Sequence, residues 1–315
     1  MRIMIGYDGS EIADAALDDL RRAGLPRQAS ALIVSVGEAA MPAASSIIDV
    51  AGAPTSSRVM SAVAQAEAES EQSLQEAKAL AAGAGERVKS YFPDWNVEVE
   101  GLVGWPATEL INRADGWNAD LVVVGSQGRS ALGRMVLGSV SKKVVTDSHH
   151  SVRVVRGPIQ KTNGKPPRVM IGVDGSTEAE HAVRSVGMRT WPAGTELRVI
   201  AVDDGTSPAR ISRILPTAAA MIRNSNEKVA EESRLMAEWA EKELTAIGLQ
   251  VSIAIEKGNS QRVLIDEARK WNADSIFVGG RRFSGAMERF RLGSVSTALV
   301  TNAHCSVEVV RSPTS

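Results

Sequence analysis

The chain has 315 residues, 43% of them hydrophobic and 23% charged, with a formal net charge of −1. Such values indicate an ordinary globular protein of about two domains. The small net charge gives no electrostatic attraction to DNA or RNA, and no apolar run approaches the roughly 18 residues of a membrane-spanning helix. A single cysteine, Cys305, excludes a disulfide within the chain. Because residues 2–7 already form a predicted strand, we expect no signal peptide. The single cysteine suits a reducing cytoplasm, where we expect the protein to be located. The small net charge favours a small-molecule partner over a nucleic acid.

The predicted elements of the first half alternate between strands and helices. Runs rich in β-branched residues predict strands at 2–7, 31–36, about 96–102, about 120–124 and 151–156. Helical patterns lie at about 12–23, about 58–91, 106–115 and about 139–147, and an Ala- and Ser-rich excursion occupies about 38–57. Such alternation implies right-handed crossovers and a parallel sheet with helices on both faces.

The second half repeats the first. The returning segments are RIMIGYDGS at 2–10 (RVMIGVDGS at 168–176), WNAD at 117–120 and 271–274, LGSVS at 137–141 and 292–296, and VVR at 154–156 and 309–311. A period this long indicates two domains, which we place at 1–156 and 168–315, with a Gly- and Pro-rich linker at 157–167. The predicted fold is two tandem doubly wound, Rossmann-like α/β sandwich domains, each with a five-stranded parallel sheet.

A glycine-spaced loop follows the fourth predicted strand. Gly125, Gly128 and Gly138 fall as G-x2-G-x9-G-S, which differs from the dinucleotide fingerprint and from the P-loop. Glycines let the backbone approach phosphate oxygens closely or take positive φ. Ser139 then lies at an expected helix N-cap, where free amides and the helix dipole favour an anion. The loop predicts a phosphate cradle; the alternative, a flexible surface turn, loses weight because the LGSVS end of the loop recurs in the second copy.

Ligands of such folds bind at the carboxyl ends of the strands. Other repeated segments follow strand ends and are therefore expected at the same edge of each sheet. In the first copy these candidates are Asp8, Gly9, Ser10, Val36 and Gly104; in the second they are Asp174, Val202 and Gly258. An anion cradle beside a carboxylate and an apolar strand end suits a nucleotide. The alternative for Asp-Gly-Ser is a tight turn in which Ser10 or Asp8 caps the next helix.

Together, the first-strand Asp-Gly-Ser, the V-G-x2-G-x9-G-S-V-S loop and the closing Val-Val-Arg resemble the universal stress protein family over nearly the whole chain. The double copy is similar to the tandem members of that family. The resemblance implies an adenine nucleotide alpha hydrolase-like fold and an ATP-binding cytoplasmic protein of stress adaptation, acting as a homodimer or an intramolecular pseudo-dimer. It also implies that Asp8 and Val36 contact the nucleoside. The residues that would hold the phosphates, with Mg²⁺, are Gly125, Gly128, Gly138, Ser139, Val140 and Ser141.

Both copies depart from the family pattern in the loop. Gln127 stands where many relatives have Arg, so Arg129 or Arg134 would have to compensate phosphate charge. The second copy keeps Gly293, Ser294, Val295 and Ser296. Counting back from Gly293 puts Gly280 first in the loop and Phe283 second; counting forward from Gly279 puts Arg282 second. A bulky residue there costs roughly 1–2 kcal/mol if left-handed φ is needed, about tenfold in affinity, unless Arg281 and Arg282 pair with phosphate. We predict tighter ATP binding in the first domain.

The remaining titratable residues carry weaker signals. The histidines at 149, 150, 181 and 304 have no metal-ligand spacing, and Cys305 is typical of a small buried residue. Glu67, Glu69, Glu71 and Glu76 indicate a solvated helix face. The last strands of the copies, 151–156 and 306–311, either pair edge to edge between copies or subunits or cap the sheet. Opposite charges at the equivalent Arg153 and Glu308 favour pairing of unlike copies.

Three classes of function follow from these features. The leading hypothesis is a regulator in which ATP orders the loops and changes dimer contacts or the affinity for a regulatory protein partner. The alternatives are a slow ATPase, for which the sequence offers no evident general base, and an interaction module with vestigial nucleotide sites.

Overall fold

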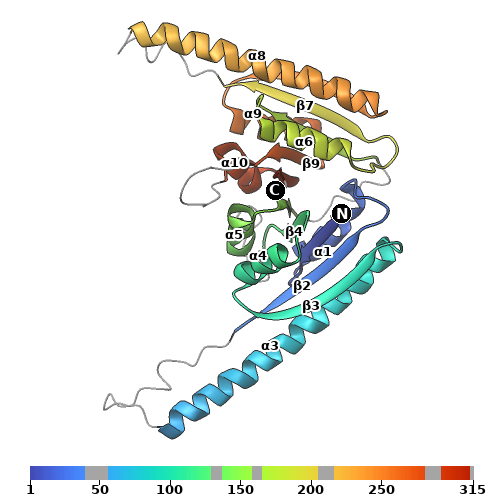
Figure 1. The fold of residues 1–315 in the computed structure, drawn as a ribbon, viewed down its shortest axis with the longest axis vertical. Coiled ribbons are helices and arrows are strands. Elements are labelled where there is room, and N and C mark those ends of the chain that lie inside the picture. The colour runs from blue at the N-terminus through green and yellow to red at the C-terminus, as the bar shows by residue number, and fades with distance from the viewer. Residues whose placement is uncertain (40–55, 129–136, 158–164, 205–215, 281–291, 313–315) are drawn as a thin grey trace.

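The computed structural model describes residues 1–39, 56–128, 137–157, 165–204, 216–280 and 292–312. Strands and helices alternate throughout (Figure 1). The elements of the first half are β1 (Arg2–Gly6), α1 (Glu11–Asp19), the 3₁₀ turn η1 (Leu20–Arg22), β2 (Ser30–Glu38), α3 (Ser56–Tyr91), β3 (Asn96–Gly104), α4 (Pro106–Gly116), β4 (Leu121–Gly125), α5 (Ser139–Asp147) and β5 (Ser151–Val155). Those of the second half are β6 (Arg168–Val173), α6 (Thr177–Gly187), β7 (Glu196–Asp203), α8 (Pro216–Ala246), β8 (Gln250–Lys257), α9 (Ser260–Trp271), β9 (Ser275–Gly279), α10 (Ser294–Asn302) and β10 (Ser306–Val310).

The predicted α/β class and the doubly wound order are confirmed. Each half contributes five parallel strands, and the complete order is β3-β2-β1-β4-β5-β10-β9-β6-β7-β8. The two predicted sheets are joined into one, because β5 and β10 pair antiparallel at its centre. The last strands therefore pair within the chain, one of the arrangements that the sequence left open. Most of the predicted excursion at 38–57 lies outside the described residues.

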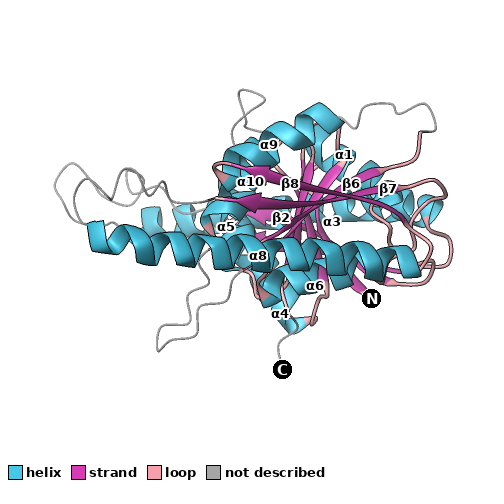
Figure 2. Ribbon diagram, turned by 90° about the horizontal axis from the view of Figure 1, so that it is seen from above, coloured by secondary structure: helices cyan, strands magenta, loops and turns pink. Residues whose placement is uncertain are grey.

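The core follows from the two-residue period of the strands. Ile3 and Ile5 pack on the side of α1 and α3, whereas Met4 between them faces the opposite side. Figure 2 shows helices on both faces. On the Met4 side, one continuous apolar cluster runs across both halves, joining β4 and β5 to β9 and β10. On the other side each half has its own cluster, so the halves share a core on one face only.

A buried cluster of charges lies where the halves meet. Arg153 of β5 is directly opposite Glu308 of β10, and both are almost fully buried. The Arg153 guanidinium contacts Asp19 at 2.5 Å and Glu308 at 3.3 Å, and Arg189 also pairs with Glu308. The Ser306 hydroxyl donates to Asp19 at 2.9 Å. Two cations thus balance two carboxylates, which confirms the pairing of unlike copies that Arg153 and Glu308 predicted.

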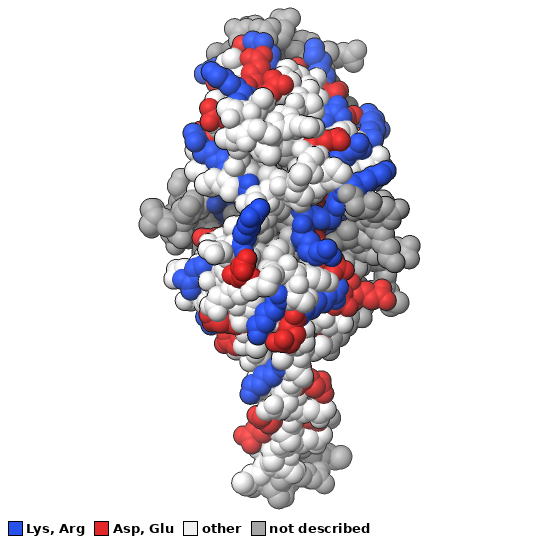
Figure 3. Space-filling view, turned by 90° about the vertical axis from the view of Figure 1, so that its right-hand side faces the viewer, with Lys and Arg blue, Asp and Glu red and all other residues white. Residues whose placement is uncertain are grey.

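The surface carries charge of both signs. On the face shown in Figure 3, acidic and basic side chains are interspersed over both halves rather than segregated into one patch. This agrees with the net charge of −1 and gives that face no broad positive field of the kind that attracts nucleic acid. Among the described residues, no helix is long and apolar enough to cross a membrane.

The buried cluster makes Glu308→Gln a test of the joint between the halves. The amide keeps the shape of the side chain but leaves Arg189 and part of Arg153 without a counter-charge. Removing one partner of a buried pair costs about 3–5 kcal/mol, so we expect urea unfolding to show a loss of about 3 kcal/mol. Glu86→Gln, at a surface carboxylate that pairs with Lys89, is the matched control and should cost less than about 0.5 kcal/mol. Equal losses in the two variants would contradict this role.

The structure buries Cys305 beside the same joint, as predicted. Burial is the main reason that the pKa of its thiol rises to about 12, and the nearby Asp274 carboxylate adds to the effect. Because the thiolate is the reactive form, we expect a disulfide reagent at about pH 8 to label the native protein roughly a thousandfold more slowly than the urea-unfolded chain. Labelling at similar rates before and after unfolding would show that the thiol is accessible.

Candidate functional site

A cavity of about 720 Å³ opens at the carboxyl ends of β1, β2 and β4. The N-terminal ends of α4 and α5 and the middle of α3 complete its walls. The structure brings together here the predicted residues Asp8, Val36, Gly125, Gln127, Gly128, Gly138, Ser139, Val140 and Ser141. Gly9, Ser10 and Gly104 do not line it, and Arg129 and Arg134 lie outside the described residues.

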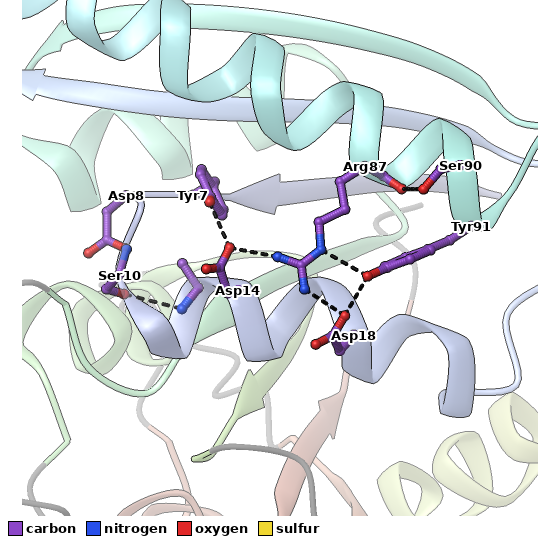
Figure 4. A network of polar contacts seen from close by, with 9 residues as sticks. Tyr7, Asp8, Ser10, Asp14, Asp18, Arg87, Ser90 and Tyr91 are labelled. Atoms are coloured by element: carbon purple, nitrogen blue, oxygen red, sulfur yellow. Dashed lines mark hydrogen bonds and ion pairs between the residues drawn. The ribbon is translucent and has the colours of Figure 1, made fainter. Parts of the chain in front are cut away.

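The Asp-Gly-Ser segment serves the turn as well as the cavity. Gly9 has a φ of +76°, and Ser10 caps α1 by accepting a hydrogen bond from the Ala13 amide at 3.1 Å. The Ser10 amide donates to Asp8 Oδ1 at 3.0 Å, so the turn also holds the Asp8 carboxylate in place (Figure 4). The capping interpretation therefore holds for Gly9 and Ser10, while Asp8 faces the cavity. Gly104 is the last residue of β3, where it pairs with Glu38 of β2.

The N-terminus of α5 forms the cradle, with one correction to the predicted cap. Gly138, not Ser139, is the N-cap, with extended φ and ψ of −65° and 156°. The amides of Ser139, Val140 and Ser141 are then the first-turn donors that have no partner within the helix. The Ser141 hydroxyl donates to the carbonyl of Ser126 at 2.9 Å, so it fastens the loop to the helix rather than facing a ligand.

The loop glycines are needed for space rather than for positive φ. Gly128 has no left-handed φ, so of the two predicted reasons for a glycine, close approach and positive φ, only close approach applies here. A Cβ at Gly128 would instead come within 2.7 Å of Asp8 Oδ2, and one at Gly125 within 3.0 Å of Ile12 Cγ2. The absence of side chains thus keeps the path between the strand end and the Asp8 carboxylate clear.

Sequence reasoning missed α3 as a wall of the cavity. Ser73, Glu76 and Leu80 of α3 line it, and they face Ser35 and Gly37 of β2. A Cβ at Gly37 would lie 2.6 Å from the Ser73 carbonyl oxygen, so only glycine allows this approach. Glu76 is exposed, as predicted, but it also faces the cavity. Gly37, directly after the predicted strand at 31–36, was the available signal, because a glycine in a strand often marks a close backbone approach.

A polar network fixes α3 to the first helix (Figure 4). The Tyr7 hydroxyl, at the cavity wall, donates to Asp14 at 2.8 Å. Arg87 of α3 pairs with Asp14 at 2.8 Å and with Asp18 at 2.7 Å, and the Tyr91 hydroxyl donates to Asp18 at 2.6 Å. Burial first, and the hydrogen bond to Asp14 second, raise the pKa of Tyr7 to about 12, so this wall presents a neutral hydroxyl. The network couples the position of α3 to the cavity.

The second half has a smaller cavity, of about 250 Å³. It is lined by the predicted Asp174, Val202, Gly293, Ser294, Val295 and Ser296, but not by Gly258 or Gly280. Pairing with β10 puts Gly279 at the place of Gly125, and the Gly280 amide bonds to the carbonyl of Val310 as Ser126 bonds to that of Val155. The prediction that Gly280 is the first glycine of the second loop is therefore corrected, since Gly280 corresponds to Ser126. Arg281, Arg282 and Phe283 lie outside the described residues.

Two substitutions alter the lining of the second cavity. Glu178 lines the cavity and stands where the first half has Ile12. Asp204 accepts hydrogen bonds from the Ser260 amide at 3.2 Å and hydroxyl at 3.0 Å, which tethers the end of β7 to α9. The first half has Pro106 at the place of Ser260, and proline has neither donor. The described part of α8 contributes no residue to this cavity.

Two neighbouring histidines contact a carboxylate away from both cavities. His149 Nδ1 lies 3.1 Å and His150 Nε2 lies 2.9 Å from the Asp115 carboxylate, which ties the ends of α4 and α5 together. Burial, followed by the nearby Arg269, lowers the pKa of His304. Within the described ranges, no group of three or more His, Cys, Asp or Glu side chains is placed to hold a metal ion.

Comparison with known proteins agrees with this architecture. A model of the Universal stress protein family matches residues 1–156 and 166–311. A universal stress protein of Mycolicibacterium smegmatis is 30% identical over 196 residues, and the match covers 62% of this chain and 62%, less than two thirds, of that relative. The universal stress protein YxiE of Bacillus subtilis is 31% identical over 157 residues, which cover 49% of this chain and 98% of the relative.

A solved structure extends the likeness over the whole fold. The crystal structure of a universal stress protein from Archaeoglobus fulgidus aligns with a TM-score of 0.61 and 21% identity, covering 99% of this chain and 96% of that one. At this identity the comparison supports the fold alone. Because the family model matches both halves and nearly all of the sequence, the chain belongs to the universal stress protein family and carries two copies of its domain.

Proposed function

We propose that the first half binds ATP in its cavity and that the protein is a nucleotide-dependent regulator in stress adaptation. The observation that carries this proposal is the junction of a helix N-terminus, a glycine loop without obstructing side chains and the Asp8 carboxylate around one cavity. Its volume of about 720 Å³ is within the range of roughly 300–1,000 Å³ that is usual for small-molecule sites. The 250 Å³ cavity of the second half is below that range.

Each part of the cavity suits one part of the nucleotide. The first-turn amides of α5 and the positive end of its dipole would bind phosphate oxygens. Asp8 offers a carboxylate to the ribose hydroxyls, and Val36, Leu110 and Val140 offer apolar contact to the purine ring. Mg²⁺ would enter with the phosphates and keep several of its own waters, as this ion does in many nucleotide sites. Nothing in this scheme requires a protein metal cage.

We infer a weaker second site from the charges and contacts around it. Glu178 lines the second cavity, where a carboxylate would repel phosphate, and the Asp204–Ser260 hydrogen bond joins two further lining residues to each other. The first half has an apolar Ile12 and a Pro106 at these two places. The expected preference of ATP for the first half therefore rests on repulsion between Glu178 and phosphate and on the Asp204–Ser260 hydrogen bond, rather than on backbone strain in the second loop.

Regulation would pass through α3. This helix walls the cavity, is fixed to α1 by Arg87, and extends well beyond the sheet (Figure 1). A nucleotide that contacts Ser73 or Glu76 would thus act on a helix whose far end is available to a second chain or to a regulatory protein. The paired halves already form an intramolecular pseudo-dimer.

Ser139→Pro tests the cradle through a single backbone donor. Proline is well tolerated at the first position of a helix, and the extended Gly138 before it is compatible with proline, so the fold should be retained. The change removes the Ser139 amide hydrogen together with the hydroxyl, and Ser139→Ala, which removes the hydroxyl alone, separates the two effects. A hydrogen bond to a charged group contributes about 1.5–3 kcal/mol, so we expect Mg-ATP to bind at least about tenfold more weakly in calorimetric titration. Ser294→Pro is the matched control in the second half; undiminished binding by Ser139→Pro would rule out this cradle.

The stoichiometry of binding tests the difference between the halves. We expect one Mg-ATP per chain in the tight class, lost in Asp8→Ala and retained in Asp174→Ala, because only the first cavity has room beside its carboxylate. Calorimetry of the two variants measures this directly. Two equal sites, or loss of binding in Asp174→Ala alone, would contradict the preference. Chromatography of nucleotide released on denaturing the purified protein identifies what the site retains, and recovery of ADP would favour the ATPase alternative.

A further inference from the structure

The cradle helix of the first half is held at its other end by the second half. Arg311 follows β10 and is 6% exposed. Its guanidinium donates to the carbonyl of Val145 in the last turn of α5 at 2.5 Å, and to the carbonyl of His150 just beyond the helix at 2.8 Å. The backbone of Arg311 is fixed as well, because its amide donates a hydrogen bond to the Ser151 hydroxyl at 3.0 Å.

The same arrangement recurs in the opposite direction. Arg156 follows β5, and its guanidinium donates to the carbonyls of Val300 and Thr301 in the last turn of α10. Val300 is the counterpart of Val145, as Arg156 is of Arg311. Each half therefore caps the cradle helix of the other with one arginine, buried in the case of Arg311 and partly buried in that of Arg156.

These arginines act on groups that a helix cannot satisfy alone. The last four carbonyls of an α-helix have no partner within it, and a cation at that end also complements the helix dipole. α5 has nine residues, or about 13 Å, so the capped turn and the cradle are close neighbours on one short rigid rod. The planar guanidinium reaches two carbonyls in fixed directions and so fixes the helix better than a single-point donor does.

Each arginine is also joined to the loop of its own half. The carbonyl of Val155, next to Arg156, accepts a hydrogen bond from Ser126 at the start of the first glycine loop at 2.7 Å. The carbonyl of Val310, next to Arg311, accepts one from Gly280 at 2.7 Å. A displacement of either loop therefore passes, through one strand end and one side chain, to the cradle helix of the other half.

We propose that Arg311 and Arg156 are positioning residues, by which each half sets the phosphate-binding helix of the other and couples the two cavities. The proposal rests on the proposed function in its reference to phosphate, but the positioning itself is a property of the protein without ligand. It makes the first cavity dependent on the second half even though none of the described residues of that half lines the cavity.

Two pairs of variants test the proposal: Arg311→Gln against Arg156→Gln, and Arg311→Lys against Arg156→Lys. In the first measurement, amide hydrogen exchange of the protein without ligand is followed in peptides covering α5 and α10. We expect the Arg311 variants to speed exchange in α5 and not in α10, and the Arg156 variants to do the reverse. Faster exchange in both helices alike, or in neither, would overturn the positioning role.

In the second measurement, calorimetry compares Mg-ATP with adenosine, which lacks phosphate. We expect Arg311→Gln to weaken Mg-ATP about fivefold at the first cavity, Arg311→Lys to recover part of that loss, and adenosine binding to be unchanged. The counterpart change Arg156→Gln, at a partly buried arginine, should leave the first cavity at wild-type affinity. A general loss of structure would weaken both ligands and would sink the proposal. If the Gln variants do not fold, the Lys pair gives the same comparison.

The two measurements separate this inference from the proposed function. Reciprocal exchange effects without any Mg-ATP binding by the wild-type protein would retain the positioning role and refute the nucleotide proposal. If the wild-type protein binds Mg-ATP and Arg311→Gln binds it equally tightly, the nucleotide proposal is retained and the positioning role is refuted.

Discussion

The buried ion cluster at the join of β5 and β10 is the constraint on which the rest of the structure depends. Arg153 and Glu308 lie opposite each other at the centre of the ten-stranded sheet, with Asp19 and Arg189 completing a neutral set. Buried charges are costly unless they are paired, so this cluster specifies the partner more than it adds stability. Two first halves paired in the same register would bring Arg153 against Arg153. The pairing of unlike halves within one chain is thereby favoured over pairing of like halves between chains.

That join places the two cavities in a fixed relation. The β5–β10 ladder brings the ends of both strands, with Arg156 and Arg311, under the cradle helix of the opposite half. On the same face the apolar core runs without a break from β4 to β9, so α5 and α10 share one packed layer. A tightly packed layer transmits displacement because it has few voids into which side chains can relax. The intramolecular pseudo-dimer is thus a single mechanical unit on the face that carries the cradles.

The two halves show how one fold supports unequal sites. Their strands, helices and sheet order correspond, and both present a helix N-terminus to a cavity. Differences at the cavities include Glu178 in place of Ile12 and Ser260 in place of Pro106. Each replaces an apolar side chain in the first half by a polar one in the second. The chemistry of the lining, rather than the fold, therefore distinguishes the two cavities.

The amino-acid sequence by itself determined the repeat, the alternation of strands and helices, and the cradle at Gly138 to Ser141. These features depend on local pattern: apolar period, β-branched runs and glycine spacing all act within a few residues. The opposite charges of Arg153 and Glu308 also predicted pairing of unlike copies. Only the tertiary structure decided which residues complete the cavity and hold its helix. The α3 wall, the tether of Asp204 to Ser260 and the reach of Arg311 to Val145 join positions far apart in the chain, and contacts of that kind depend on how the elements pack, which local pattern does not encode.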